Sequence, residues 1–235
     1  MRSYADACGI TRALDVVGER WAIPVVRELI FGPRRYSDLA AALPGVSTNI
    51  LGSRLKELTA ADVVVKRRLS PPAATTVYEL TPWGAALEPV LISLGRWAAR
   101  TPADLEKQAF SASSFALSLR ATFNPAAAAG TTLTLSLVMG TDVFEASIDD
   151  ADFTIRRAEQ TDAQVHLHGE PKQLADLVYQ RRDPAEAHGT GAVQIEGPLE
   201  SVQTFVGCFD LPEALITPHA TQLTHQVDQD GWKQP

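Results

Sequence analysis

Two groups of residues in this sequence of 235 residues carry side chains suited to bind a polyanion. One group is a run of three cations, Lys66, Arg67 and Arg68. The other is a set of polar residues at helical spacing that includes Asn49, Ser53 and Lys56. Lys and Arg neutralise phosphates and release counterions, and amides and hydroxyls hydrogen-bond phosphates and base edges. The sequence therefore predicts contact with nucleic acid. The alternative for the three cations is a solvated strand edge, where charge discourages pairing.

The elements that must position these groups are short helices followed by a hairpin. Apolar spacing over residues 5–100 predicts helices, two strands and a further helix in the order 8–18, 20–31, 37–43, 47–60, 63–68, 75–80 and 82–99. Pro44-Gly45-Val46 marks a turn, and Ser47 is placed to cap the helix that follows it. This order of elements is that of a winged helix-turn-helix.

The helix 47–60 has one apolar face and one polar face. Leu51, Leu55 and Leu58 fall within ~60° of one another at ~100° per residue, so they must face the core. The opposite face then carries Asn49, Gly52, Ser53 and Lys56. Small polar side chains and one cation suit entry into a major groove. A solvated surface helix is the alternative, but the preceding helix, the turn and the wing favour DNA.

Further candidate contacts lie around the same elements. Arg34 and Arg35 precede the third helix, and Tyr36 is able either to contact the DNA backbone or to pack beneath the turn. Arg54 lies nearer the core side of its helix, where an internal ion pair competes with a phosphate contact. The candidate DNA-binding residues are Arg34, Arg35, Tyr36, Ser47, Thr48, Asn49, Ser53, Arg54, Lys56, Lys66, Arg67 and Arg68.

Charge is divided unevenly along the chain. The whole sequence carries a net charge of −7. Residues 1–100 hold 13 basic and 9 acidic residues, while residues 101–235 hold 8 and 19. Such asymmetry points to a nucleic-acid-binding part joined to a part with another task. The acidic part also predicts weak nonspecific affinity for DNA.

Composition, the lengths of apolar runs and the cysteine content indicate the cellular compartment of the protein. A hydrophobic content of 45% with 21% charged residues is that of a folded, water-soluble protein. We find no apolar run of ~18 residues and no signal peptide, so we expect a cytoplasmic protein without a membrane segment. The two cysteines, Cys8 and Cys208, are 200 positions apart and fit a reducing compartment.

Several motifs of the N-terminal half resemble one family. They are Cys8-Gly9-Ile10, Ala13-Leu14-Asp15-Val16-Val17-Gly18-Glu19-Arg20-Trp21, Arg35-Tyr36-Ser37-Asp38-Leu39, Pro44-Gly45-Val46-Ser47, Leu51-Gly52-Ser53-Arg54-Leu55-Lys56-Glu57-Leu58 and Tyr78-Glu79-Leu80-Thr81-Pro82-Trp83-Gly84. Together they resemble the HxlR family of bacterial winged helix-turn-helix transcription regulators, relatives of the MarR group. The resemblance implies a homodimer whose terminal helices form the interface and whose recognition helices read a near-palindromic operator. The apolar residues of the helix 82–99 support dimerisation only loosely.

Cys8 matches the cysteine that some members of that family use to sense oxidants or electrophiles. A thiol near Arg12 could gain thiolate character, but a cysteine is also simply a small hydrophobic residue. No second cysteine lies nearby in the sequence, so a sensor would need a disulfide between subunits or an adduct with a small thiol.

The C-terminal half reads as an α+β domain. A helix at 110–123 precedes alternating strands at 131–140, 143–149, 153–157 and 163–169, which predict an antiparallel sheet. A helix at 171–180, a strand at 192–197 and a helix at 198–209 follow. We therefore expect a DNA-binding and dimerisation domain at 1–100, a second domain at 110–212 and a polar tail at 213–235, with a junction near Thr101–Lys107.

Short motifs in that half resemble the sterol carrier protein type 2 domain. They are Val165-His166-Leu167-His168-Gly169-Glu170-Pro171, Leu174-Ala175-Asp176-Leu177, Arg182-Asp183-Pro184, Val193-Gln194-Ile195-Glu196-Gly197 and Phe209-Asp210-Leu211-Pro212. The resemblance implies a tunnel for a lipid or another apolar small molecule. A filled core is the alternative reading of the same apolar faces.

Enzyme chemistry finds little support. His166 and His168 share a strand face, but two ligands without a third do not make a zinc site. The sequence has no nucleophile elbow, and Gly189-Thr190-Gly191 is not a phosphate loop. We expect no catalysis, metal or cofactor. The hypotheses are a dimeric regulator that binds operator DNA and an apolar effector, a lipid carrier that uses the winged helix as a dimerisation scaffold, and a redox-sensing regulator based on Cys8.

Overall fold

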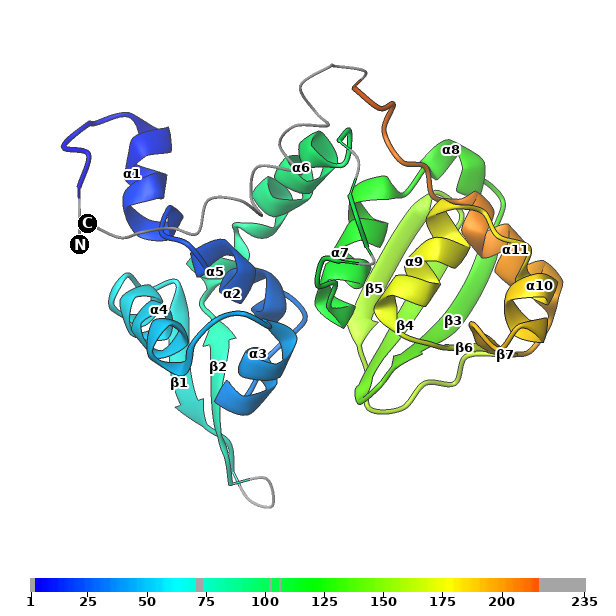
Figure 1. Cartoon of the computed structure of the whole chain (residues 1–235), viewed down its shortest axis with the longest axis horizontal. Coiled ribbons are helices and arrows are strands. Elements are labelled where there is room, and N and C mark those ends of the chain that lie inside the picture. Colours follow the sequence, from blue (N-terminus) through cyan, green and yellow to red (C-terminus); the bar gives the residue numbers. More distant parts are fainter. Residues whose placement is uncertain (1–2, 71–73, 102, 106, 216–235) are drawn as a thin grey trace.

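The structure, a computed structural model, describes residues 3–70, 74–101, 103–105 and 107–215 (Figure 1). They form an N-terminal lobe that ends with α6 and a C-terminal lobe that begins with α7. Buried hydrophobic residues of the two lobes make one continuous core. The boundaries of separate domains at 1–100 and 110–212 therefore stay a prediction. The tail beyond residue 215 and the wing tip at 71–73 lie outside the described residues.

The N-terminal lobe has the predicted order of helices and strands. Its elements are α1 (Gly9–Val17), α2 (Ala22–Leu29), α3 (Tyr36–Ala42), α4 (Thr48–Ala60), β1 (Val64–Arg68), β2 (Thr76–Leu80), α5 (Pro82–Ala85) and α6 (Glu88–Ala98). Strands β1 and β2 form an antiparallel hairpin. It extends away from the rest of the lobe (Figure 1). This is the arrangement of a winged helix-turn-helix.

One expected helix is divided in two. The sequence predicts a single helix over 82–99, but α5 ends at Ala85 and α6 begins at Glu88. Pro89 lies in the first turn of α6. Because proline has no N–H to give to the carbonyl four residues earlier, a continuous helix would lose a bond there. The chain instead turns, and α6 runs toward the C-terminal lobe (Figure 1).

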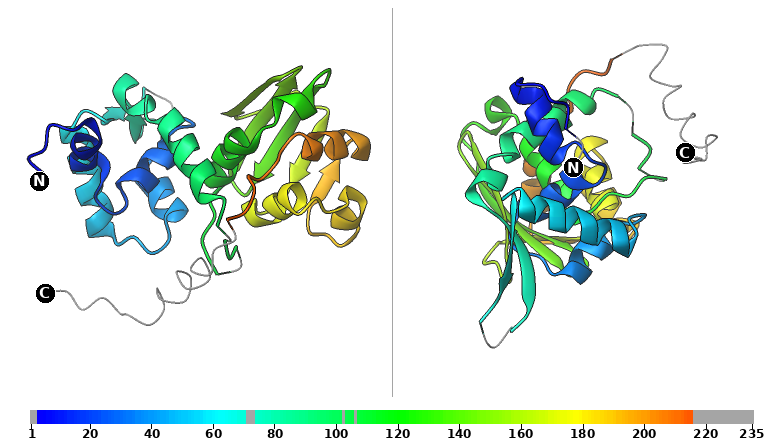
Figure 2. Two further views of the ribbon diagram at one scale, coloured as in Figure 1. Left: turned by 90° about the horizontal axis from the view of Figure 1, so that it is seen from above. Right: turned by 90° about the vertical axis from the view of Figure 1, so that its left-hand side faces the viewer.

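The C-terminal lobe is a sheet covered by helices. Its elements are α7 (Ala112–Thr122), α8 (Pro125–Ala128), β3 (Thr132–Met139), β4 (Asp142–Asp149), β5 (Asp152–Arg157), β6 (Val165–His168), α9 (Pro171–Tyr179), α10 (Pro184–Gly189), β7 (Gln194–Glu196) and α11 (Leu199–Gly207). The helices lie on one face of the sheet (Figure 2). The fold is therefore α+β, as the sequence predicts.

The prediction of a wholly antiparallel sheet is wrong. The strand order is β5-β4-β3-β6-β7, and β6 pairs with β3 in parallel while the other pairs are antiparallel. Residues 158–164 carry the chain from one edge of the sheet to the far side of β3 before β6 begins. Alternation of polar and apolar residues marks a strand but does not identify the strand that pairs with it, so this crossing could not be predicted from the local pattern.

The two lobes meet through ion pairs and packed rings. Arg34 pairs with Asp142 at the start of β4, and Glu88 pairs with Arg120 of α7. The ring of Phe31 packs edge-on against that of Phe144, with centroids 5.2 Å apart. These contacts join the helix-turn-helix directly to the sheet.

Candidate nucleic-acid interface

Helix α4 presents the two faces that the sequence predicts. Leu51, Leu55 and Leu58 are buried, at 0%, 2% and 1% exposure. Asn49, Gly52, Ser53 and Lys56 are exposed, together with Thr48. The hydroxyl of Ser47 accepts a hydrogen bond from the Ile50 amide at 3.3 Å, so Ser47 caps the helix as expected. The start of α4 is therefore fixed, and its polar side chains are free of the core.

The polar face of α4 differs in how its side chains are engaged. Ser53 donates a hydrogen bond to Glu57 at 3.0 Å, so its hydroxyl already has one partner. Lys56 has no carboxylate partner among the described residues. An exposed cation with no internal partner keeps its full charge for a phosphate. Lys56 is thus the strongest electrostatic contact that α4 offers.

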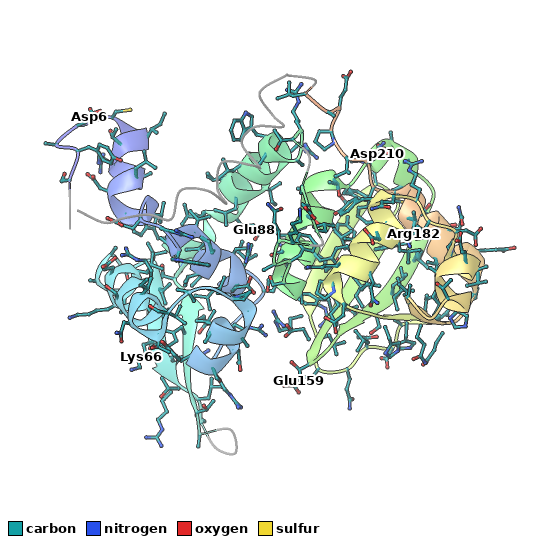
Figure 3. The ribbon with its side chains drawn as sticks, in the orientation of Figure 1. Asp6, Lys66, Glu88, Glu159, Arg182 and Asp210 are labelled. Carbon is teal, nitrogen blue, oxygen red and sulfur yellow. The ribbon has the colours of Figure 1, made fainter. Side chains whose placement is uncertain are left out.

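The wing supplies further cations. Lys66 pairs with Tyr78 across the hairpin, and its ammonium lies 5.9 Å from the centre of that ring. Arg67 donates two hydrogen bonds to Glu79, the shorter at 2.7 Å, which partly neutralises it. Arg68 is exposed and has no ion-pair partner among the residues that the structure describes. Figure 3 shows Lys66 near the base of the hairpin, on the side of the lobe away from the sheet.

Arg35 is the remaining exposed cation of this region. Its backbone N–H donates to Asp38 at 3.1 Å, which holds the start of α3. The adjacent Arg34 exchanges backbone hydrogen bonds of 2.9 and 2.8 Å with Tyr78 of β2. These bonds place the loop that carries Arg35 beside the base of the wing.

Three of the candidate DNA contacts have partners within the protein, and their contact with DNA stays a prediction. The guanidinium of Arg34 is only 11% exposed and binds Asp142, so this cation serves the contact between the lobes. The Tyr36 hydroxyl donates to the Thr48 carbonyl at 2.7 Å and joins α3 to α4, which is the packing alternative. Arg54 pairs with Glu57 and lies 3.9 Å from Glu19, which is the internal ion pair that its position favours.

A buried acid between the lobes has no counterpart among the sequence-based candidates. Glu28 is fully buried in α2, and its Oε1 accepts hydrogen bonds from Arg27 at 2.8 Å and from Ser111 at 2.7 Å. Ser111 also caps α7 by accepting from the Ser114 amide. In the sequence, Glu28 is marked only as a single acid among the apolar residues of α2. Its partner Ser111 is 83 positions away, so the sequence alone could not predict their contact.

Cys8 lies where its thiol reaches solvent. It precedes α1, is exposed, and has its pKa lowered from the ordinary value by the backbone N–H groups of Ile10 and Thr11. The lowering comes from these amides, whereas the sequence pointed to Arg12. Burial instead raises the pKa of Cys208.

Among the described residues, the histidine pair of β6 is not joined by further metal-ligating side chains. The His166 and His168 rings are 6.4 Å apart, and the nearest carboxylate to His168 is that of Glu196 at 3.7 Å. Within the described ranges no cluster of three His, Cys, Asp or Glu side chains could hold a metal ion. Over those same residues, no helix has the length and apolar character needed to cross a membrane.

Comparisons with known proteins concern the N-terminal lobe. Residues 16–105 match the HxlR-like helix-turn-helix family. The chain is 40% identical over 88 residues to the uncharacterized HTH-type transcriptional regulator YvaP of Bacillus subtilis, covering 37% of this chain and 81% of YvaP. It is 31% identical over 86 residues to the HTH-type transcriptional regulator YodB of the same species, covering 37% of this chain and 77% of YodB.

The solved structures include the reduced form of YodB from B. subtilis. It aligns with 40% of this chain and 94% of its own chain, at 29% identity and a TM-score of 0.37. The family match ends at residue 105, before α7 begins.

Proposed function

The chain belongs to the HxlR-like helix-turn-helix family, and from this membership we propose that it is a transcription regulator that binds double-stranded operator DNA. Helix α4 enters the major groove, and the β1–β2 wing follows the phosphate backbone. The observation that carries the proposal is the exposed polar face of α4, opposite three buried leucines. On this face Lys56 has no carboxylate partner in the part of the chain that the structure describes. The proposal places the protein in the cytoplasm with its DNA and assigns it no catalytic step.

The same proposal includes a homodimer on a near-palindromic operator. Helix α1 has no buried residue and exposes Ile10 at 73%. Helix α6 exposes Val90 at 57% and Trp97 at 68%. Exposed apolar side chains on these helices favour burial against a partner, and a second copy of the chain is the partner that we propose. A dimer would also present two copies of α4 to two half-sites.

The C-terminal lobe is the proposed sensor. Its resemblance to the sterol carrier protein type 2 domain supports a hydrophobic effector, and its ion pairs with the helix-turn-helix supply a route of coupling. An effector regulates only if it binds the DNA-competent and the incompetent arrangements with different affinity. The exposure and lowered pKa of Cys8 favour a second candidate, a redox-sensing regulator. In that case Cys8→Ser removes any release of DNA by oxidants.

Two glycines provide a matched test of DNA binding. Gly52 in α4 and Gly207 in α11 are both exposed, and an added Cβ would meet nothing within 4 Å at either. Gly52→Glu places a negative charge on the proposed DNA face, and Gly207→Glu makes the same change on the other lobe. Anisotropy with labelled DNA from upstream of the protein's own gene should show at least tenfold weaker binding for Gly52→Glu only.

Two results would overturn the assignment. One is wild-type protein that binds the upstream DNA no more tightly than shuffled DNA of equal length. The other is equal affinity for Gly52→Glu and Gly207→Glu. Lipid retained by a protein that fails on DNA would support the lipid-carrier alternative, with the winged helix as a dimerisation scaffold.

A further inference from the structure

A cavity of about 910 Å³ lies between the two lobes. Helices α2 and α6 contribute its walls on the N-terminal side, and α7 and α9 contribute those on the C-terminal side. Residues 211–215 run along its edge and hydrogen-bond to Arg100, whose carbonyl accepts from the Leu215 amide at 2.8 Å. The cavity is therefore built by both lobes and by the segment that ends the described chain.

The lining of this cavity is mostly aliphatic. Ile23 and Leu91 line it from one lobe, and Leu117 and Ala121 line it from the other. The cavity is partly open to solvent, so a ligand can enter it without unfolding of either lobe. Its volume falls in the range of small-molecule sites, ~300–1,000 Å³. The volume and the apolar lining suit an alkyl or ring body.

Two arginines, Arg27 and Arg100, lie among the apolar residues of the lining. The Nε of Arg100 donates to the Glu213 carbonyl at 3.2 Å, and no carboxylate pairs with this guanidinium among the described residues. The other arginine of the lining, Arg27, is already paired with Glu28. The positive charge of Arg100 is thus available to an anionic head group, and a guanidinium binds a carboxylate with two parallel hydrogen bonds.

We propose that this cavity binds an amphipathic monocarboxylic acid of fatty-acid size, with its apolar body between the lobes and its carboxylate on Arg100. The inference rests on the proposed function, in which an apolar effector regulates DNA binding. It locates the binding site of that effector at the boundary of the two lobes and outside the core of the C-terminal lobe. Its walls include α2, which packs on α4, and α6, the proposed dimer helix. A bound acid therefore contacts the two helices whose relative position decides how a dimer meets DNA.

Gly95 of α6 allows the cavity to be filled without a clash at the backbone. It lines the cavity, and an added Cβ would meet nothing within 4 Å. Gly95→Phe is compared with the full wild-type chain and with Gly207→Phe, which makes the same change in open space on α11. The probe is cis-parinaric acid, a fluorescent polyene fatty acid, titrated in the absence of DNA. We expect saturable binding that weakens at least tenfold in Gly95→Phe and is unchanged in Gly207→Phe.

The head group is tested separately with the methyl ester of the same probe. Arg100→Gln should weaken binding of the acid about tenfold and leave that of the ester within twofold, because only the acid carries a charge for Arg100. Circular dichroism and light scattering on each variant check fold and oligomeric state. Equal loss of acid and ester in Arg100→Gln would overturn the assignment of the carboxylate.

The remaining outcomes distinguish failure of the proposed cavity site from failure of the proposed DNA-binding function. Absence of saturable binding, or equal binding by Gly95→Phe and wild type, overturns the site even if the wild type binds its upstream DNA. Binding that emerges only after removal of residues 216–235 assigns the cavity to the chain's own tail and also overturns it. Probe binding that depends on Gly95 in a protein without specific DNA binding supports the site and overturns the regulator instead.

Discussion

Arg34 and Asp142 are 108 positions apart in the sequence and form a two-pronged ion pair, with N–O distances of 2.6 and 3.2 Å. Arg157 binds the same carboxylate. Burial lowers the pKa of Arg157, and the positive charge of Arg34 lowers it further, while Asp142 opposes both. Burial alone would also lower the pKa of Arg34, but the hydrogen bond and charge of Asp142 raise it above its ordinary value. One carboxylate thus pairs with two cations at the contact between the lobes and offsets part of their mutual repulsion.

Removal of that carboxylate should destabilise the contact. Asp142→Ala leaves two guanidiniums, 11% and 19% exposed, without the carboxylate that pairs with both, and only the more distant charge of Glu28 then acts on the two of them. We expect a loss of roughly 2 kcal/mol in the free energy of unfolding, less than the ~3–5 kcal/mol for fully buried pairs because solvent still reaches this site. Urea denaturation followed by circular dichroism measures it.

Glu145 provides the control on the same strand. It pairs with Arg156, whose side chain is 65% exposed, so Glu145→Ala should cost less than ~1 kcal/mol. Equal denaturation midpoints for Asp142→Ala and Glu145→Ala would contradict the importance of the contact between the lobes.

The comparison of Arg34 with Lys56 shows what the sequence could predict. Helical spacing alone places Lys56 on the outer face of α4, because each residue of a helix turns by a fixed angle. The same reasoning gives the buried leucines of α4 and the capping role of Ser47. Arg34 looks equally available in the sequence. Its partner belongs to a strand in the other lobe, and local periodicity carries no information on such distant contacts.

The pairing of the strands could not be predicted either, because it also depends on contacts between residues far apart in the sequence. The alternation of Val165 and Leu167 with polar residues identifies β6, and both side chains are buried. The parallel pairing of Leu137 with Leu167 depends on where the chain crosses the sheet, which no local pattern reports. The cavity between the lobes is likewise formed by residues from Ile23 to Leu215, and it exists only once the lobes are joined.

Cys8 should react faster with alkylating agents than Cys208. Its thiol is exposed and its pKa lies below the ordinary value, so it holds more thiolate at neutral pH, whereas Cys208 is buried with a raised pKa. Mass spectrometry after brief treatment with iodoacetamide should find the label on Cys8 first, and the rate should level off at a lower pH than for a free thiol. Cys208→Ser should leave this rate unchanged. Labelling that favours Cys208 would refute the prediction.

Tyr179 should make the protein less stable in strong alkali. Burial raises the pKa of its phenol from 10.0 to about 12, with its hydrogen bonds to Ser118 and Thr122 opposing the rise. Because the folded state favours the neutral phenol, this contribution to stability is complete below about pH 10 and is lost as the pH rises toward about 12. Thermal unfolding across that range measures the loss.

Two tyrosine variants isolate this effect. Tyr179→Phe should have a lower melting temperature at neutral pH, because the hydrogen bond of 2.6 Å to Ser118 is gone, but a shallower fall above pH 10. Tyr4→Phe removes a phenol that is 63% exposed and serves as the control. If the melting temperatures of wild type and Tyr179→Phe fell in parallel above pH 10, a group other than Tyr179 would be responsible for the loss of stability.

Lys56 and Asn49 should affect DNA binding in different ways, because one carries charge and the other carries only hydrogen-bonding groups. If Lys56 contacts a phosphate, Lys56→Ala should weaken binding to all sequences and reduce the slope of log affinity against log salt by about 1. If Asn49 contacts a base edge, Asn49→Ala should keep the slope and lose ~1–3 kcal/mol of preference for the operator. Anisotropy titrations at several salt concentrations, with operator and shuffled DNA, separate the two effects.

Arg182 is the control for charge removal. It lies on the C-terminal lobe far from Lys66 of the wing (Figure 3), and its side chain is 53% exposed. Arg182→Ala removes the same charge as Lys56→Ala, so an equal change of salt slope in both variants would mean that overall charge, and no contact by α4, governs affinity. An unchanged slope in Arg182→Ala beside a reduced slope in Lys56→Ala would place a phosphate at α4, because counterions are released only where a cation meets the DNA.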